Sequence, residues 1–119
     1  MRVLIVDDNE ELREFMALCL TEAAVDAEAV GTPEEALAAI ETERFNLVAV
    51  DSVLGEADGI ALVEQIRGTR AGKKLPVIVM STISTALARR MAQSAGSNEF
   101  LVKPFGQMQF IEQVKSLAR

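Results

Sequence analysis

The sequence predicts an α/β fold, in which a doubly wound sheet of five parallel strands carries five helices on its two faces. Two observations support this prediction. Short runs of valine, leucine and isoleucine recur along the chain, and each is too short for a helix but typical of a strand buried on both faces. Between them, apolar residues repeat at helical spacing, so strand and helix alternate. Such alternation implies right-handed crossovers and helices on both sides of a parallel sheet.

Five segments are predicted strands. Val3–Val6, Leu47–Val50, Val77–Met80 and Phe100–Val102 are almost wholly apolar, as expected of buried parallel strands. Val25–Val30 partly alternates between apolar and acidic residues, which predicts a strand with one wetter face or an edge position.

Capping residues mark the start of one helix. Thr32 is a favourable N-cap, Pro33 suits the first helical position, and Glu35 follows three residues after the cap. A helix is therefore predicted to begin at Pro33.

The other helices are predicted from apolar stripes, which we expect to face the core. These stripes are Leu12, Phe15, Met16, Cys19 and Leu20; Leu62, Val63 and Ile66; Leu87, Met91 and Ala95; and Phe110, Ile111, Val114 and Leu117. Three glycines follow helical stretches, where a left-handed cap is favoured, namely Gly31, Gly68 and Gly96.

Length and composition predict a single domain over residues 1–119, with 50% apolar and 25% charged residues. The net charge of −6 and the absence of a basic patch argue against direct binding to nucleic acid. The chain has no histidine, which excludes a Ser-His-Asp triad and a Cys/His zinc site. Any bound metal is therefore expected to have oxygen ligands.

The chain's location is predicted from its first residues and its cysteine. The first apolar run is only four residues long, which predicts neither a signal peptide nor a membrane span. Cys19 has no partner for an internal disulfide, and its apolar stripe predicts a buried, inert thiol. These features predict a reducing, cytoplasmic location.

Polar residues follow the predicted strands at the edge of the sheet where ligands bind in this fold class. They are Asp7 and Asp8 after the first strand, Asp51 after the third, Ser81 and Thr82 after the fourth, and Lys103 with Pro104 after the fifth. Two unit charges about 4 Å apart repel by roughly 4 kcal/mol at an effective dielectric constant near 20. Three grouped carboxylates therefore need positive charge, which Lys103 and a Mg²⁺ ion would supply.

The same residues carry a resemblance to a known family. Val3–Asp8, Leu47–Asp51, Asp58-Gly59, Val77–Ser81 and Phe100–Phe105 resemble, in order and separation, the receiver domain of bacterial two-component response regulators, the CheY-like domains. The resemblance covers essentially the whole chain. It implies the strand order 2-1-3-4-5 of that fold.

The resemblance also implies a reaction. The residue matching Asp51 would accept a phosphoryl group from the histidine of a sensor histidine kinase, from a histidine phosphotransfer protein or from a small acyl phosphate. Asp8 would bind Mg²⁺ directly, Asp7 would act through water, and the backbone carbonyl of Val53 would complete the protein ligands. Lys103 and Mg²⁺ would neutralise the charge of the transferred group. The domain would not be a turnover enzyme.

A conformational switch is implied as well. The Ser81 hydroxyl would turn towards a phosphate oxygen, and Phe100 would move inward. The affected face would be the fourth helix, fifth strand and fifth helix, roughly Thr85 to Arg119, where a downstream protein would dock. The Lys103–Pro104 bond resembles the family's cis peptide bond.

Three positions depart from the family's usual pattern. Gly55 stands where proline is common, so the loop after Asp51 is expected to be less restrained. Thr82 is bulkier than the usual alanine or glycine, which predicts slow phosphorylation by small donors. Val53 cannot orient an attacking water molecule, which predicts a persistent phosphoryl group.

Two other functions stay open. A pseudo-receiver would have the fold and bind partners without phosphorylation. The departures at Gly55 and Thr82 favour it, whereas the intact set Asp7, Asp8, Asp51, Ser81 and Lys103 argues against it. A Mg²⁺-dependent phosphohydrolase of the haloacid dehalogenase type usually has Asp-x-Asp, whereas this chain has Asp51-Ser52-Val53. Because Met1 lies close to the first strand, a stand-alone receiver is expected.

Overall fold

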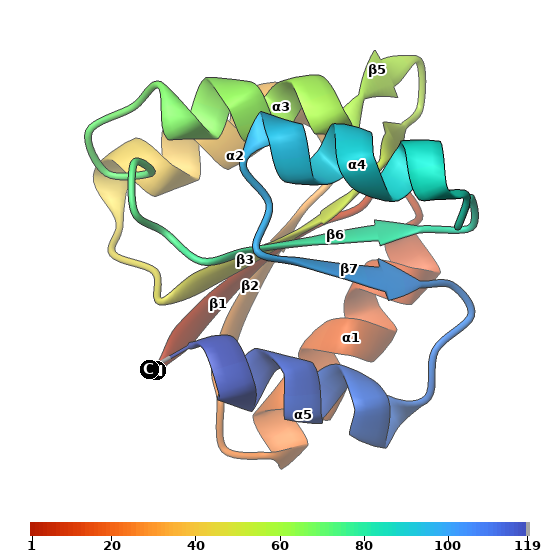
Figure 1. Ribbon diagram of the computed structural model, residues 1–119. Coiled ribbons are helices and arrows are strands. Elements are labelled where there is room, and N and C mark those ends of the chain that lie inside the picture. Colours follow the sequence, from red (N-terminus) through yellow and green to blue (C-terminus); the bar gives the residue numbers. More distant parts are fainter. Residues whose placement is uncertain (119) are drawn as a thin grey trace.

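The central sheet has five parallel strands in the order β2-β1-β3-β6-β7. The structure is a computed structural model that describes residues 1–118 (Figure 1). The strands are β1 (Arg2–Val6), β2 (Asp26–Val30), β3 (Leu47–Asp51), β6 (Val77–Ser81) and β7 (Glu99–Val102). With the short strands β4 and β5 set aside, this is the predicted order 2-1-3-4-5, and β2 is the predicted edge strand.

Five helices cover the two faces of the sheet, as predicted. They are α1 (Glu10–Glu22), α2 (Pro33–Thr42), α3 (Gly59–Arg67), α4 (Ala86–Ala95) and α5 (Gln107–Leu117). Helices α2, α3 and α4 lie on one face, and α1 and α5 lie on the other (Figure 1). Within residues 1–118, no helix is both long enough and apolar enough to cross a bilayer.

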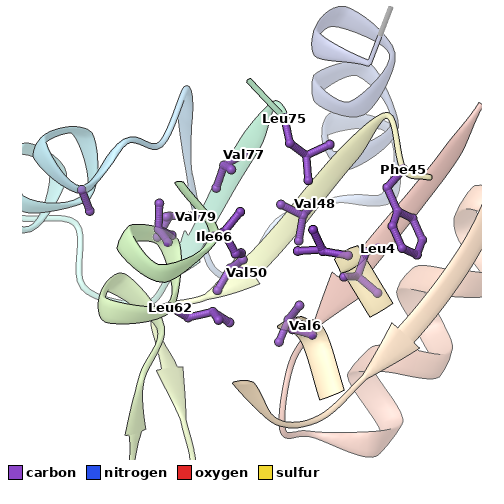
Figure 2. Packing of buried hydrophobic residues seen from close by; sticks show 14 of the residues in the cluster. Leu4, Val6, Phe45, Val48, Val50, Leu62, Ile66, Leu75, Val77 and Val79 are labelled. Atoms are coloured by element: carbon purple, nitrogen blue, oxygen red, sulfur yellow. The ribbon is translucent and has the colours of Figure 1, made fainter. Parts of the chain in front are cut away.

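Two hydrophobic cores lie on opposite sides of the sheet, because successive strand residues point to opposite faces. Under α2, α3 and α4, Leu4 and Val6 of β1 pack with Val48 and Val50 of β3 and with the apolar stripe of α3 (Figure 2). The alternate residues of β1, β3 and β6 face α1 and α5, and they are Val3, Ile5, Leu47, Ala49, Ile78 and Met80. All these strand residues are fully buried.

Side-chain caps fix the starts of four helices. Asn9, Thr32, Asp58 and Thr85 each accept a hydrogen bond from a backbone N–H in the first turn of the helix that follows. The predicted start of α2 at Pro33 is confirmed, and the Thr32 hydroxyl also contacts the Glu35 carboxylate at 3.1 Å. These caps satisfy N–H groups that have no partner inside the helix.

The predicted glycine caps are correct at one position of three. Gly96 ends α4 with a left-handed backbone at φ 117°. Gly68 ends α3, but its φ of −78° is right-handed, so its conformation does not require glycine. Gly31 follows strand β2 rather than a helix.

The predicted core stripe of α4 is wrong at Leu87 and Met91 and correct at Ala95. Leu87 and Met91 are 67% and 52% exposed, whereas Ala92 is fully buried and Ala95 nearly so. Both stripes have helical spacing, and the alanine stripe faces the sheet because small side chains allow the helix to lie close to it. Phe15 of α1 is also exposed, at 46%.

A short hairpin, which the sequence pattern does not predict, follows β3. Strands β4 (Val53–Leu54) and β5 (Ala57–Asp58) pair antiparallel across a two-residue turn that begins with Gly55. Gly55 has φ 64°, a conformation that favours glycine. The glycine therefore permits the tight turn that connects β4 to β5.

The single cysteine, Cys19, lies on the buried face of α1 and is 2% exposed. Burial raises the pKa of its thiol above the ordinary value. Because the thiolate is the nucleophilic form, this supports the prediction of an inert thiol.

Candidate functional site

The parallel sheet brings the predicted polar residues to one edge. Asp51 is the last residue of β3 and Ser81 the last of β6, while Asp7 and Lys103 directly follow β1 and β7. The strand register places Asp51 beside Met80, and Ser81 beside Val102. Residues far apart in sequence therefore meet at the carboxyl ends of the strands.

Lys103 is the centre of this group. Its Nζ atom donates hydrogen bonds to Asp51 Oδ2 at 2.8 Å and to Asp7 Oδ2 at 2.9 Å. The Asp7 side chain is fully buried, and those of Lys103 and Asp51 are each 13% exposed. One ammonium group thus partly neutralises two carboxylates that are largely removed from water.

Backbone N–H groups hold the carboxylates from the other side. Asn9 N donates to Asp7 Oδ1 at 2.9 Å, and Val53 N donates to Asp51 Oδ1 at 3.2 Å. The third acid, Asp8, is exposed, and its Oδ2 accepts a hydrogen bond from Gly55 N at 3.0 Å. The hairpin turn therefore contacts the site directly.

At Asp51 and at Lys103 alike, burial and the neighbouring charge of opposite sign shift the pKa in opposite directions. Burial raises the pKa of Asp51 above its ordinary value, and the hydrogen bond from Lys103 only partly offsets this rise. For Lys103, burial alone would lower the pKa, but the hydrogen bonds to Asp51 and Asp7 outweigh it and raise the pKa. Lys103 is therefore cationic at neutral pH, which keeps a positive charge beside Asp51.

The acids suit an oxygen-ligated cation. One carboxylate oxygen from each of Asp7, Asp8 and Asp51 lies within 4.8 Å of the others. Mg²⁺ prefers a few carboxylate ligands and keeps several water molecules, and exposed Asp8 gives the cluster an open side. The residues present thus fit Mg²⁺.

The Ser81 hydroxyl has partners other than Asp51. Ser52 Oγ donates to Ser81 Oγ at 2.9 Å, and Ile83 N donates to the same atom at 3.0 Å. Phe100 is half-buried, and the Arg89 guanidinium carbon lies 5.0 Å from the centre of its ring. Between Ser81 and Phe100 lies a cavity of about 180 Å³.

Three further residues named in the sequence prediction are Pro104, Thr82 and Arg119. The Lys103–Pro104 peptide bond is cis, as expected. Thr82 is exposed, and Arg119, the last residue of the predicted docking face, lies outside the described residues.

Sequence reasoning missed several residues that shape the site. The sequence pattern does not single out Ser52, although a hydroxyl directly after the candidate nucleophile is a usable signal of a site residue. Gly59 is needed because a Cβ there would lie 1.8 Å from the Asp51 carbonyl oxygen. Arg13 donates to the Asp7 carbonyl at 2.9 Å, and no local pattern in the sequence indicates this contact.

Comparisons with known proteins agree with this architecture. The family model of the response regulator receiver domain matches residues 3–115. The chain is 29% identical over 119 residues to the response regulator MprA of Mycobacterium tuberculosis, and it spans 51% of that protein. It thus spans about half the length of the curated relatives it matches.

Solved structures show the same fold. The chemotaxis protein CheY4 of Vibrio cholerae matches with a TM-score of 0.93 at 24% identity, over 98% of this chain and 97% of that one. The receiver domain of the sensor histidine kinase PA1611 from Pseudomonas aeruginosa matches with a TM-score of 0.89 at 22% identity, over 98% and 96%. That second structure holds a magnesium ion in its active site cleft. Because the family model matches residues 3–115 of this chain, the chain belongs to the response regulator receiver domain family.

Proposed function

We propose that this receiver domain is a phosphoacceptor switch in which Asp51 accepts a phosphoryl group. Receiver domains are signalling modules, and the proposal concerns the reaction and the residues that perform it. The observation that carries it is the contact of Lys103 with both Asp51 and Asp7 at the edge of the sheet.

The reaction is an in-line transfer from a phosphohistidine of a sensor kinase or phosphotransfer protein. An Asp51 oxygen forms a bond to phosphorus while the bond between phosphorus and the donor nitrogen breaks, and the electron pair of that bond stays on the imidazole. The absence of histidine from this chain is consistent with a donor imidazole that the partner supplies.

Each residue of the site has a distinct part. Lys103 supplies a fixed positive charge beside the transferred group, and such preorganised charge is the main contribution to phosphoryl transfer. Asp7 and Asp8, with Asp51 and the Val53 carbonyl, would hold Mg²⁺, which supplies further charge neutralisation when bound. The N–H of Val53 already orients Asp51 by donating to Oδ1.

Phosphorylation would act on partners through α4, β7 and α5. The Ser81 hydroxyl would exchange its present partners for a phosphoryl oxygen, and Phe100 would enter the neighbouring cavity of about 180 Å³. This changes the outer surface of β7 and α4, where Arg89 contacts the Phe100 ring. A downstream protein that distinguishes the two surfaces would read the signal. With its acidic charge, the domain would act through proteins and not nucleic acid, in the cytoplasm.

Incubation with acetyl phosphate and Mg²⁺ tests the central step. Intact-mass measurement should show one added phosphoryl group, which EDTA or the substitution Asp51→Asn abolishes. Asp26→Asn, an exposed carboxylate at the start of edge strand β2, is the matched control and should be phosphorylated normally. No phosphorylation by acetyl phosphate or by a phosphohistidine donor would instead favour the pseudo-receiver, a binding module with the same fold. Hydrolysis of a generic phosphate ester with turnover would favour the phosphohydrolase.

Two residues beside the site are proposed to set its rates. Thr82 is proposed to slow entry of small donors, so Thr82→Ala should speed phosphorylation by acetyl phosphate. The exposed side chain of Val53 cannot orient water, so Val53→Asn or Val53→Glu should shorten the lifetime of the phosphoryl group. An unchanged rate in either case would refute the corresponding part of the proposal.

A further inference from the structure

We propose that Ser52 is a positioning residue whose hydroxyl holds Ser81 in a resting orientation and opposes the switch. The inference rests on the proposed function, because the switch it concerns follows phosphorylation of Asp51. It assigns a regulatory part to the residue directly after the phosphoacceptor.

The backbones of both serines are held in place. Ser52 N donates to the Met80 carbonyl at 2.8 Å, and the Ser52 carbonyl accepts from Gly59 N at 2.9 Å. Ser81 ends β6, and its carbonyl accepts from Lys103 N at 2.8 Å. With both backbones held, the contact between the two hydroxyls is broken mainly by rotation of a side chain about its Cα–Cβ bond.

The resting partners of Ser81 occupy its hydroxyl oxygen. A serine hydroxyl donates one hydrogen bond and accepts up to two. Ser81 Oγ is hydrogen-bonded to Ser52 Oγ at 2.9 Å and accepts from Ile83 N at 3.0 Å, so two of its three hydrogen-bonding positions are occupied. A change of the χ1 rotamer moves Oγ to another staggered position and therefore breaks both contacts.

The surroundings give Ser52 few other partners. The two hydroxyls lie at the wall of the cavity of about 180 Å³, and the rest of that wall is mainly apolar, with Ile60, Ile83, Met91 and Phe100 among its residues. A hydroxyl that loses its partner beside such a wall is destabilised, and water offsets only part of the loss because Ser52 is half-buried. Ser52 therefore favours the resting state.

The expected change in the ratio of active to resting states follows from the strength of one hydrogen bond. The typical net stabilisation by one hydrogen bond changes an equilibrium constant about fivefold. Removing the Ser52 hydroxyl should therefore raise the population of the active state about fivefold relative to the resting state.

An NMR titration with beryllofluoride in saturating Mg²⁺ measures this shift. The chain has no tryptophan or tyrosine, so backbone amide signals replace intrinsic fluorescence. Ser52→Ala and Ser52→Val should each reach half-saturation at about one-fifth of the wild-type concentration. Ser52→Thr has the shape of Ser52→Val but retains the hydroxyl, so it should titrate like the wild type. Thermal melts of each variant check that the fold is intact.

A second readout tests whether Ser52 acts through Ser81. In the free protein, side-chain couplings of Ser81 should report one dominant χ1 rotamer, and Ser52→Ala should populate a second. In a Ser81→Ala background, the further change Ser52→Ala should leave the titration midpoint unchanged, because the two effects are not additive.

The outcomes separate the inference from the proposed function. If the wild type itself gives no response to beryllofluoride, the phosphoacceptor proposal fails before any variant is compared. If the wild type responds but Ser52→Ala has an equal or higher midpoint, only the role of Ser52 is overturned. A shift in Ser52→Ala that persists without the Ser81 hydroxyl, or a Ser52→Thr midpoint equal to that of Ser52→Val, overturns it as well.

Discussion

Gly59 and Asp51 approach each other so closely that a Cβ on Gly59 would lie 1.8 Å from the Asp51 carbonyl oxygen. Gly59 N also donates to the Ser52 carbonyl at 2.9 Å. The start of α3 therefore lies directly against the end of β3, and a side chain at this position has no space. This contact fixes the backbone of the candidate phosphoacceptor.

The substitution Gly59→Ala should destabilise the protein and displace Asp51. Alanine normally stabilises a helix relative to glycine, but here the added carbon meets backbone atoms, and the resulting shift should cost about 2–3 kcal/mol. Thermal denaturation measures the loss, and the acetyl phosphate reaction should slow in parallel. Gly106→Ala is the control, because a Cβ there meets nothing within 4 Å. Equal melting temperatures for the two variants would contradict the close approach.

Magnesium should stabilise the folded domain through Asp8. A cation at ten times its dissociation constant adds about 1.4 kcal/mol, which is a rise of roughly 5 °C in Tm for a domain of this size. Asp8→Asn should abolish this rise and leave the Tm without Mg²⁺ almost unchanged, because Asp8 is exposed and asparagine can still accept from Gly55 N. Asp58→Asn, which retains the N-cap of α3, should respond to Mg²⁺ like the wild type. A full Mg²⁺ response in Asp8→Asn would place the cation elsewhere.

Glu28 should lower stability at neutral pH. Burial, with the neighbouring Glu43 carboxylate, raises its pKa above 4.5, and Arg2 Nη2 lies 3.8 Å away while Arg2 pairs with Asp26 and Glu43. Glu28 Oε2 has no hydrogen-bond partner among the described residues.

The sign of the pH dependence follows from that raised pKa. Because the folded state binds the proton more tightly than the unfolded state, stability falls as pH rises through the interval between the two pKa values. Glu28→Gln should therefore raise Tm at pH 7 by about 1–3 °C, a small effect because the side chain is 35% exposed, and the gain should vanish below pH 4.5. Glu41→Gln, an exposed residue of α2, removes the same charge and should lack this gain. Equal gains in both variants would point to net charge alone.

Arg67 joins α3 to the segments around it. Its guanidinium donates to the carbonyls of Gly72, Leu75 and Gly96 and to the Asn98 side chain. Asn98 Oδ1 in turn accepts from Val77 N at 2.8 Å, at the start of β6.

The substitution Arg67→Lys should therefore cost about 2–3 kcal/mol, because a single ammonium cannot reach all these acceptors and leaves partly buried carbonyls without partners. Urea denaturation measures the loss. Arg70→Lys, at an exposed position, is the matched control and should change stability by less than about 0.5 kcal/mol. If Arg67→Lys lowers the free energy of unfolding by less than about 1 kcal/mol, water molecules replace the hydrogen bonds that the guanidinium donates, and the prediction is wrong.

The sheet and the acidic edge could be predicted from sequence because both depend on local patterns. A run such as Val3–Val6 is interpretable alone, and the residue after it must lie at the carboxyl edge of a parallel sheet. The grouping of Asp7, Asp51 and Lys103 therefore follows once the strands are identified. The distances between them follow only from the register of the strands.

Other features depend on contacts that no local pattern encodes. In α4 the predicted stripe Leu87, Met91 and Ala95 and the buried pair Ala92 and Ala95 both have helical spacing, and only the fit against the sheet decides which residues are buried. The β4–β5 hairpin is too short for an alternating pattern. The pairing of Ser52, which directly follows β3, with Ser81 at the end of β6 depends on the rotamers of two side chains that are distant in sequence.

The contact between Asp7 and Lys103 spans 96 positions of the chain. During translation, Asp7 and Asp51 leave the ribosome before Lys103 does, so these two carboxylates lack their ammonium partner until the end of β7 has been synthesised. A chain stalled before Lys103 would therefore contain Asp51 without the ammonium group on which the proposed phosphoryl transfer depends.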